Sequence, residues 1–397
     1  MNTPKIRFKG FTDDWEQRKL GDVCSRVQGN DGRMELPTLT ISAGNGWMRQ
    51  EDRFSGNIAG KEQKNYTLLR KGELSYNHGN SKLAKYGTVF SLQTYEEALV
   101  PRVYHSFKVK EGNCDFVEYY FATKLPDREL SKLISSGARM DGLLNIGYDE
   151  FMGIQMKFPS TLEQRKISLY FRKLDHLITL HQRKCDETKE LKKFMLQKMF
   201  PKNGEKNPEI RFEGFTDDWE QRKFEDVGTV AMCKRIFKEQ TSEEGEVPFY
   251  KIGTFGGIPD AYITRELFEE YKKNYQYPNK GDILISASGS IGRTVEYTGK
   301  DEYYQDSNIV WLKHENDLDN SFLKVLYGVI EWSCEGSTIK RLYNDNFLKT
   351  EFMLPKIEEQ IKIGEYFSKL DHLITLHQRK CEKLKELKKF MLQNMFV

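Results

Sequence analysis

The segment KLDHLITLHQRKC at residues 173–185 recurs unchanged at residues 369–381, and this repeat decides the fold. A second shared stretch, KELKKFMLQ, follows each copy. No glycine or proline occurs from residue 163 to residue 200, and Pro159 and Pro201 bracket this segment. Because helix-forming residues dominate it, we expect one long helix here and another in the second copy. A segment of 38 residues, at about 1.5 Å per residue, would extend about 57 Å.

Along both copies, apolar side chains recur in alternating steps of four and three residues, which is the spacing of a coiled coil. We therefore predict that the two helices pack on each other as an antiparallel coiled coil. The alternative is that each helix lies separately on the surface of its own globular part. The predicted helix-pair seam consists of Ile167, Phe171, Leu174, Ile178, His181, Cys185, Ile363, Phe367, Leu370, Ile374, His377 and Cys381.

This seam places a histidine and a cysteine four residues apart in each helix. If the helices run antiparallel, His181, Cys185, His377 and Cys381 meet near the middle. Two cysteines and two histidines can bind zinc. A polar layer that fixes the register of the helix pair is the commoner use of such residues. We favour the polar layer and predict no metal.

A leading motif, GFTDDWEQRK, is repeated as well, at residues 10–19 and 214–223. Each half of the chain thus has a repeated leading motif, a variable body and a repeated tail. The repeats predict a target-binding domain at 1–162, a spacer helix with a linker at 163–208, a second domain at 209–358 and a second spacer helix at 359–397. The bodies, residues 24–162 and 228–358, share few residues, which suggests that two modules on one frame have different targets.

Short strands and helices alternate in the bodies without a regular strand–helix–strand rhythm. Residues 36–41 and 247–252 have the composition of strands that lead into glycine-rich loops. Residues 117–125 and 321–332 have helical spacing. We therefore predict an α+β fold class: two mixed globular domains joined by two long helices, with a pseudo-twofold internal repeat.

Composition excludes several classes of protein. The mean hydropathy is −0.68 and no apolar run approaches the length of a membrane span. The first residues lack the apolar core of a secretion signal, and the six cysteines are scattered without a CxxC pair. We expect a cytoplasmic protein. A net charge of +3 neither indicates nor excludes binding to nucleic acid.

Motifs of catalysis are also missing. The sequence contains no P-loop, no HExxH and no methyltransferase signature. A weak nuclease pattern can be drawn through Asp260, Glu270 and Lys272, although the same ExK triplet occurs on the plain charged helix at 187–192. We expect a protein that is not an enzyme.

Polar loops follow equivalent landmarks, KGEL at 71–74 and KGDI at 280–283, in the two bodies. Their side chains are of the types that contact phosphates and base edges. The candidate DNA-binding residues are Asn45, Trp47, Asn77, His78, Asn80, Ser81, Lys82, Arg139, Ser286, Ser288, Ser290, Arg293, Lys340 and Arg341.

In this order of motifs the chain resembles the specificity (S) subunit of Type I restriction–modification enzymes. The resemblance rests on the duplicated leading motif, on the two landmarks, on residues 336–341, and on Glu163-Gln164 and Glu359-Gln360, which open the long helices. It covers essentially the whole chain. The first body departs from the pattern, with Ala138-Arg139-Met140 where the second has Ser337-Thr338-Ile339.

The resemblance implies that each body reads half of a split site in double-stranded DNA. It implies that the helices set the spacing of the bodies and dock two modification (methyltransferase) subunits. S-adenosylmethionine, ATP and magnesium would be bound by partners, including the restriction and translocase subunits, with no cofactor in this chain. Two rival hypotheses are a protein scaffold without a role on DNA and a nuclease that acts alone.

Overall fold

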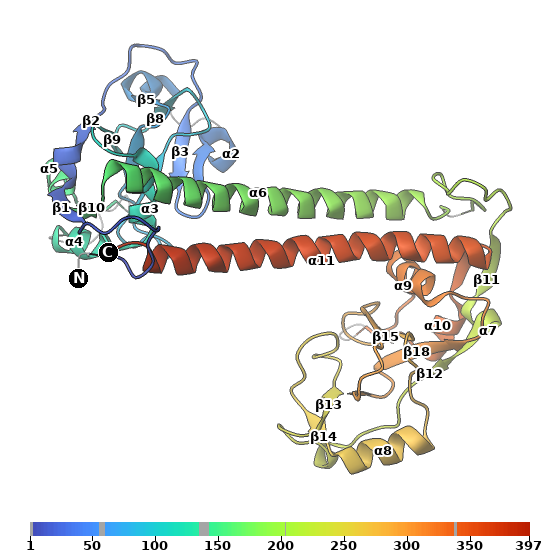
Figure 1. Cartoon of the computed structure of the whole chain (residues 1–397). Coiled ribbons are helices and arrows are strands. Elements are labelled where there is room, and N and C mark those ends of the chain that lie inside the picture. Colours follow the sequence, from blue (N-terminus) through green and yellow to red (C-terminus); the bar gives the residue numbers. More distant parts are fainter. Residues whose placement is uncertain (1–2, 55–59, 135–142, 203, 337–339) are drawn as a thin grey trace. The chain divides into compact units, whose positions relative to one another are not determined.

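A computed structural model describes residues 3–54, 60–134, 143–202, 204–336 and 340–397 (Figure 1). The chain divides into two compact units. Unit 1 comprises residues 1–182 and 379–397, and unit 2 comprises residues 183–378. Each unit therefore contains one globular body and parts of both long helices.

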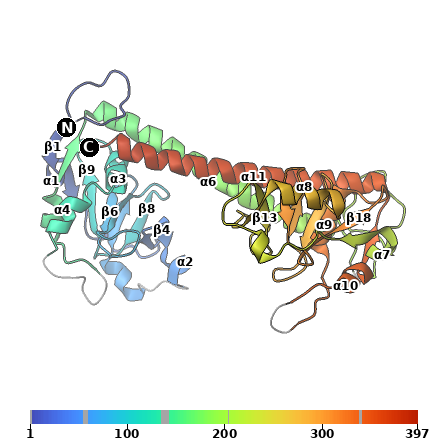
Figure 2. The same ribbon diagram turned by 90° about the horizontal axis from the view of Figure 1, so that it is seen from below.

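The body of unit 1 is built around a four-stranded sheet with the strand order β2-β9-β6-β7. Helix α3 packs on this sheet (Figure 2). Its Phe116 and Val117 belong to the same buried cluster as Leu74 and Phe107 of the sheet. The elements of this half are β1 (Glu16–Lys19), α1 (Leu20–Val23), β2 (Cys24–Arg26), β3 (Leu39–Ser42), β4 (Gly46–Arg49), α2 (Gln50–Phe54), the 3-10 helix η1 (Gly60–Asn65), β5 (Thr67–Arg70), β6 (Leu74–Asn77), β7 (Thr88–Ser91), β8 (Glu97–Val100), β9 (His105–Val109), α3 (Cys114–Ala122), α4 (Asp127–Lys132), α5 (Tyr148–Met152), β10 (Gln155–Phe158) and α6 (Thr161–Lys198).

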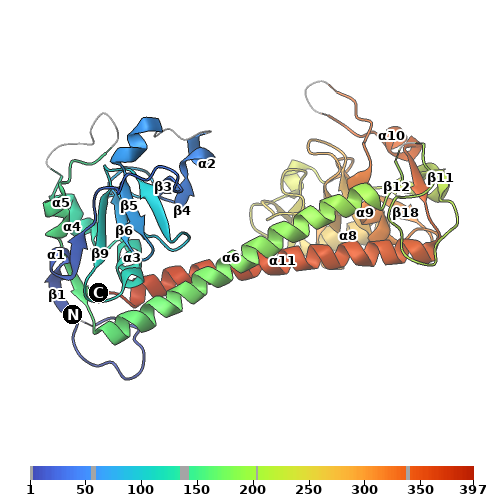
Figure 3. The same ribbon diagram turned by 90° about the horizontal axis from the view of Figure 1, so that it is seen from above.

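The body of unit 2 repeats this plan with the strand order β12-β18-β15-β16. Helix α9 takes the place of α3, and its Phe322 and Leu323 are buried against Ile283 and Leu312 of the sheet (Figure 3). The elements are β11 (Glu220–Lys223), α7 (Phe224–Val227), β12 (Gly228–Ala231), the 3-10 helix η2 (Lys238–Gln240), β13 (Val247–Tyr250), β14 (Tyr262–Ile263), α8 (Arg265–Asn274), β15 (Ile283–Ser286), β16 (Thr294–Glu296), β17 (Tyr303–Tyr304), β18 (Ile309–His314), α9 (Asn320–Val329), α10 (Asn344–Lys349), β19 (Glu351–Leu354) and α11 (Ile357–Asn394).

Both leading motifs form the same antiparallel ribbon with the last strand of their body. Glu16 pairs with Phe158 in β1-β10, and Glu220 pairs with Leu354 in β11-β19. The second layer of strands differs, because unit 1 has the separate pairs β3-β4 and β5-β8 where unit 2 has the sheet β14-β13-β17. The predicted α+β class with two long helices and an internal repeat is confirmed.

The two long helices pair in an antiparallel manner within each unit. In unit 1, Lys388 of α11 lies 2.5 Å from Asp175 of α6, and Cys381 lies 3.6 Å from Gln182. In unit 2, Lys192 of α6 lies 2.5 Å from Asp371 of α11. The predicted coiled-coil pairing is confirmed on these contacts.

The start of each long helix is also buried in its own body. The alternative prediction, in which each helix lies on its own globular part, therefore describes these first turns. Ile167, Phe171 and Leu174 belong to the core of unit 1, together with Met395 and Phe396 from the end of α11. Ile363, Phe367 and Leu370 belong to the core of unit 2, together with Met199 and Phe200 from the end of α6. The other seam positions Ile178, His181, Ile374 and His377 are half-buried, while Cys185 and Cys381 are buried.

A buried ion pair fastens each leading motif to the first turn of its helix. Arg7 donates two hydrogen bonds to Glu163, at 2.7 and 2.8 Å, and a third to the carbonyl of Asp13. Arg211 makes the same contacts with Glu359, at 2.7 and 2.8 Å, and with the carbonyl of Asp217. Both glutamates are 1% exposed. We call this arrangement the latch.

The glutamine that follows each of these glutamates fixes the helix of the body. The side-chain oxygen of Gln164 accepts from the amide of Asn113, which caps α3, at 3.0 Å. The side-chain oxygen of Gln360 accepts from the amide of Asp319, which caps α9, at 2.9 Å. The shared Glu-Gln pair therefore joins the leading motif, the body and the long helix in both units.

Candidate nucleic-acid interface

In each body, the loop after the central strand meets the segment that returns toward the last strand. Leu144 donates its backbone N–H to the carbonyl of His78 at 2.8 Å, next to an isolated bridge between Gly79 and Leu143. Leu342 donates in the same way to Ala287 at 2.8 Å, next to a bridge between Ser288 and Arg341. The candidate loops of the two bodies thus occupy equivalent places in the fold.

In unit 2, the predicted serines of this loop divide into two kinds. Ser286 is fully buried; its hydroxyl donates to the carbonyl of Ser290 at 2.5 Å and accepts from the amide of Arg293 at 2.9 Å. Ser288 is buried and its hydroxyl lies 2.8 Å from the side-chain oxygen of Asn308. Ser290 is exposed. Ser286 and Ser288 therefore shape the loop, while Ser290 faces solvent.

The predicted cations of unit 2 also differ in role. Arg293 donates to the carbonyls of Phe255 and Ile252, at 2.9 and 3.2 Å, so that its guanidinium holds a neighbouring loop. Lys340 is exposed, and the guanidinium of exposed Arg341 makes one long contact of 3.4 Å with Asn308. Lys340 and Arg341 therefore remain available for a ligand.

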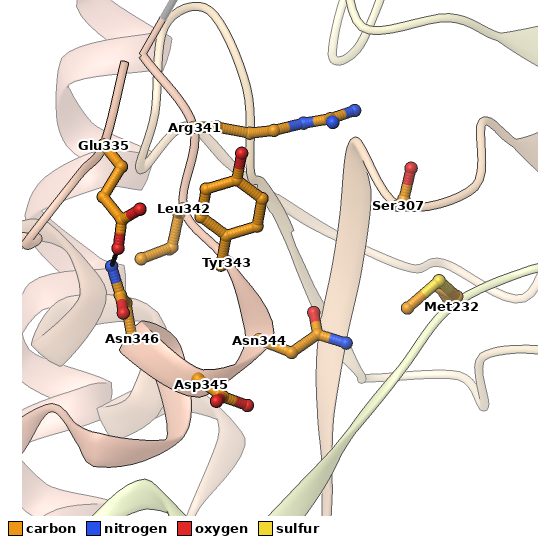
Figure 4. A pocket seen from close by; sticks show the side chains of 9 residues that line it. All are labelled: Met232, Ser307, Glu335, Arg341, Leu342, Tyr343, Asn344, Asp345 and Asn346. Carbon is orange, nitrogen blue, oxygen red and sulfur yellow. Dashed lines mark hydrogen bonds between the residues drawn. The ribbon is translucent and has the colours of Figure 1, made fainter.

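Arg341 borders a pocket of about 550 Å³ (Figure 4). The pocket is polar along one side, where Glu335 accepts a hydrogen bond from Asn346 at 3.0 Å. Ser307 at its edge has a φ of 38°, a left-handed conformation that is uncommon for serine and is often found at functional sites. The lining residues are Met232, Ser307, Glu335, Arg341, Leu342, Tyr343, Asn344, Asp345 and Asn346.

In unit 1, two of the predicted side chains are used by the protein itself. His78 is buried, and its ring nitrogens each lie 2.9 Å from a carbonyl, that of Leu144 and that of Val103. Asn77 is half-buried; it donates to the carbonyl of Ile41 at 3.3 Å and accepts from the amide of Gly79 at 3.0 Å. His78 and Asn77 therefore position the loop.

The other predicted residues of this loop face solvent. Asn80, Ser81 and Lys82 are exposed, and Ser81 accepts the amide of Ala84 at 3.1 Å. In the hairpin β3-β4, Asn45 is exposed, whereas Trp47 is half-buried and donates to the carbonyl of Ser91 at 3.1 Å. Asn80 and Lys82 are thus better placed than Trp47 to touch a ligand.

Arg139 lies outside the described residues. The strand pairing matches Arg341 of unit 2 with Leu143, a position at which unit 1 has no cation. Sequence reasoning missed Arg102, which lies in the loop before β9 and lines a pocket of about 670 Å³ beside Asn77 and Asn80. It also missed Tyr343 and Asn344 of unit 2. No sequence landmark precedes Arg102, so only the strand order reveals it.

Under the loop of unit 1, two histidines lie close together. The ring centroids of His78 and His105 are 4.9 Å apart, and Nε2 of His105 lies 2.8 Å from the carbonyl oxygen of Ile146. Since a carbonyl oxygen accepts, the ring nitrogen of His105 is the donor. Burial lowers the pKa of His105, which favours its neutral form. The equivalent position in unit 2 is Val310, so this histidine pair belongs to one body alone.

Comparisons with known proteins agree with this duplicated architecture. Residues 216–386 match the family described as the Type I restriction modification DNA specificity domain. A putative type I restriction enzyme specificity subunit of Haemophilus influenzae is 55% identical over 150 residues, which are 37% of this chain and 39% of that protein. The chain is therefore similar to type I restriction enzyme specificity subunits.

More distant relatives match nearly the whole chain. A putative type I restriction enzyme MjaX specificity subunit of Methanocaldococcus jannaschii is 21% identical over 98% of this chain and 94% of its own length. The crystal structure of a Type-I restriction-modification system S subunit from M. genitalium has a TM-score of 0.63, at 14% identity, and covers 100% of this chain and 99% of its own. This structure supports the fold, and the resemblance predicted from the sequence is confirmed.

The cysteines of the helix pair lie against the backbone of the facing helix. In unit 2, the sulfur of Cys185 lies 4.0 Å from the carbonyl oxygen of Ile374, and in unit 1 that of Cys381 lies 3.9 Å from that of Ile178. Among the described residues, no group of three or more His, Cys, Asp or Glu side chains is arranged to hold a metal ion.

Two residues of the weak nuclease pattern, Asp260 and Lys272, have separate partners. Asp260 pairs with Lys251 at 2.9 Å, while Lys272 lies 3.5 Å from Asp301 and over the rings of Phe268 and Tyr277. Of the helices in the described parts of the chain, none is long and apolar enough to cross a membrane.

Proposed function

We propose that this chain is the DNA-reading subunit of a type I restriction–modification complex, and that each body reads one half of a bipartite site. The observation that carries the proposal is the contrast within the repeat. The ion pair of the latch, the leading ribbon and the helix pair recur in both units, while the loops at the candidate interface differ in residue type and charge. Reading of two different half-sites requires such a contrast.

The proposed domain boundaries follow this division. The two reading domains would comprise residues 1–162 and 209–358, and the two spacer segments would comprise residues 163–208 and 359–397. Methyl transfer and DNA cleavage would be performed by partner subunits, which would bind S-adenosylmethionine, ATP and magnesium. Such a complex would act in the cytoplasm, where the DNA of a prokaryotic cell lies.

The exchange of one body tests this proposal. We expect that replacing residues 24–162 by the corresponding segment of another family member changes one half of the methylated motif and leaves the other half intact. Methylome sequencing of cells that carry the partner subunits, with the native chain, the exchanged chain or no chain, measures this. A change in both halves would contradict independent reading, and a methylome that does not depend on the chain would contradict the function.

We further propose that each unit docks one methyltransferase subunit through the same apolar surface. Unit 1 exposes Leu177, Leu387 and Phe390 on the paired helices, at 39 to 53% of their surfaces. Unit 2 exposes the repeat-related Leu373, Leu191 and Phe194, at 41 to 48%. The contact of Lys388 with Asp175 places the three side chains of unit 1 within about two helical turns of one another along the pair. Exposed apolar groups retained in both copies are typical of a binding surface.

A stoichiometry measurement tests the docking surface. We expect Phe390→Asp to leave one bound methyltransferase subunit of two, and Phe390→Asp with Phe194→Asp to leave none, by native mass spectrometry of the copurified complex. Leu162→Asp is the matched control, because Leu162 is 61% exposed on α6 but has Glu358 at its repeat-related position. Retention of two subunits by the double variant would contradict this assignment.

A further inference from the structure

The strand pairing allows the two candidate interfaces to be compared position by position. Tyr76 pairs with His105 in unit 1, and Ile285 pairs with Val310 in unit 2. Counting back three residues from His105 and from Val310 matches Arg102 with Ser307. The two bridges match Leu143 with Arg341.

Among the described residues, this comparison places an arginine of the candidate interface in a different loop of each body. Unit 2 has its arginine on the returning segment, at Arg341, and a serine in the loop before the last sheet strand. Unit 1 has leucine on the returning segment, at Leu143, and its arginine in the loop before the strand, at Arg102. Each described interface thus has one exposed guanidinium that is not bound to a backbone carbonyl, Arg102 in unit 1 and Arg341 in unit 2, and the two come from different elements.

Arg102 has the properties of a ligand-binding side chain. It is exposed, and within the described residues no hydrogen bond or ion pair engages its guanidinium. Arg53, the other arginine of the same pocket, donates to the carbonyl of Ile41 at 2.7 Å and is therefore committed to the protein. The exposed amide of Asn80 borders the pocket near Arg102 and also lacks a partner in the described part of the chain.

The loop that carries Arg102 is held in place. A ring nitrogen of His78 lies 2.9 Å from the carbonyl oxygen of Val103, the next residue, and the other ring nitrogen lies 2.9 Å from that of Leu144. Tyr104 is buried, and its hydroxyl accepts the amide of Ile41 at 3.2 Å. A fixed loop with a free guanidinium is suited to directional recognition, since the planar fork of arginine forms two parallel hydrogen bonds.

We propose that Arg102 is a specificity-determining residue of the first body and reads a guanine of its half-site through the major groove. This inference rests on the proposed function. Arginine forms two hydrogen bonds with O6 and N7 of guanine, and no other base presents these two acceptors together. Arg341 would be its counterpart in the second body, which reaches its base from the other loop.

Two substitutions separate base reading from attraction to a phosphate. Arg102→Lys retains the charge and loses the paired hydrogen bonds, whereas Arg102→Ala loses both. We expect both variants to weaken binding to the native site by roughly 5- to 150-fold, and to make one guanine position of the first half-site degenerate in the methylome. The second half-site remains unchanged, and Arg341→Ala relaxes the second half-site alone. The readouts are methylome sequencing and salt-dependent DNA binding by the complete methyltransferase complex.

Other results would overturn the assignment. One is the absence of guanine from the first half-site, which is identified as the half that changes when residues 24–162 are exchanged. Another is a contact with phosphate in place of a base. In that case Arg102→Lys would bind DNA with native affinity. Arg102→Ala would bind all sequences more weakly by the same factor, with a salt dependence reduced by about one phosphate contact. An unchanged first half-site in either variant would do the same. In each of these cases the native chain still directs a methylated motif, so failure of this inference differs from failure of the proposed function.

Discussion

The two bodies are most alike where they join the helices and least alike where they would meet DNA. Both units have the latch, the Glu-Gln pair and a sheet of one strand order. At the candidate interface the buried His78 of one corresponds to Ala287 of the other, and the free arginine comes from different loops. The comparison teaches that the duplicated sequence encodes a shared frame, which we call the mount, and that this mount accommodates different loops at the candidate interface.

Within the mount, the latch itself differs in one hydrogen bond. Trp219 of unit 2 donates its indole N–H to Glu359 at 3.1 Å. The indole N–H of the equivalent Trp15 is buried and has no partner among the described residues. When Arg211 is removed, Glu359 therefore keeps the hydrogen bond from Trp219. When Arg7 is removed, Glu163 keeps no such bond from Trp15.

The largest effect is expected from breaking the latch of unit 1. Arg7→Ala leaves the carboxylate of Glu163 buried without its ion pair, which costs about 3–5 kcal/mol. Arg211→Ala should destabilise unit 2 by about 1.5–3 kcal/mol less than Arg7→Ala destabilises unit 1. A hydrogen bond to a charged group contributes about this much, and the hydrogen bond from Trp219 to Glu359 remains in Arg211→Ala. Hydrogen exchange with mass spectrometry measures the stability of each body separately in the intact chain.

Lysine at the same position is the control for this pair of variants. Arg7→Lys keeps the charge and should recover part of the loss, because one ammonium group replaces a two-pronged contact. Equal losses for Arg7→Ala and Arg211→Ala would contradict the role assigned to Trp219. A loss in the opposite body would contradict the assignment of each latch to its own unit.

The sequence predicted the repeated parts of the fold well, because repetition and helical spacing are local signals. The long helices followed from the apolar stripes that start at Ile167 and Ile363, and the α+β class followed from the alternation of short strands and helices in the bodies. The candidate interface was harder to predict. His78 and Ser286 are polar residues in loops, yet both are buried, and Arg102 becomes part of the interface only through the pairing of β9 with β6. Contacts between strands far apart in the sequence decide which polar loop residue is free.

Close packing of the body on the helix is a further feature that composition does not reveal. A Cβ atom at Gly364 of α11 would lie 2.7 Å from the backbone nitrogen of Phe322 in α9, so glycine is required there. The repeat-related residue in α6 is Ser168, which is buried and whose hydroxyl has no partner in the described structure. The helices are thus adapted to their own bodies even within the shared frame.

The same adaptation is seen one turn further along, where α6 has Arg172 and α11 has Ser368. Arg172 forms an ion pair with Asp115, lies 3.4 Å from Glu118, and donates to the hydroxyl of Ser91 at 2.9 Å. On the helix α9 of unit 2, the positions that correspond to Asp115 and Glu118 carry Ser321 and Lys324. An arginine in α6 thus accompanies acidic residues in the body that it touches.

A smaller effect, with a dependence on pH, is expected from transferring the serine of α11 to α6. Burial raises the pKa of Glu118, and the nearby charge of Arg172 opposes this rise. In Arg172→Ser the pKa of Glu118 should therefore be higher still. A carboxyl group whose pKa is higher in the folded state than in the unfolded state favours folding at low pH, and this contribution is lost as the pH rises through the folded-state pKa.

We expect Arg172→Ser to destabilise unit 1 by about 1–2 kcal/mol at pH 8, since Arg172 is about one-third exposed, and by less at pH 5. Hydrogen exchange of α3 at both pH values measures this, and Glu118→Gln in the same background should remove the difference. An equal loss at pH 5 and pH 8 would show that Arg172 stabilises the body by packing over Tyr119, whose ring lies 5.7 Å from its guanidinium carbon, and not through the charge of Glu118.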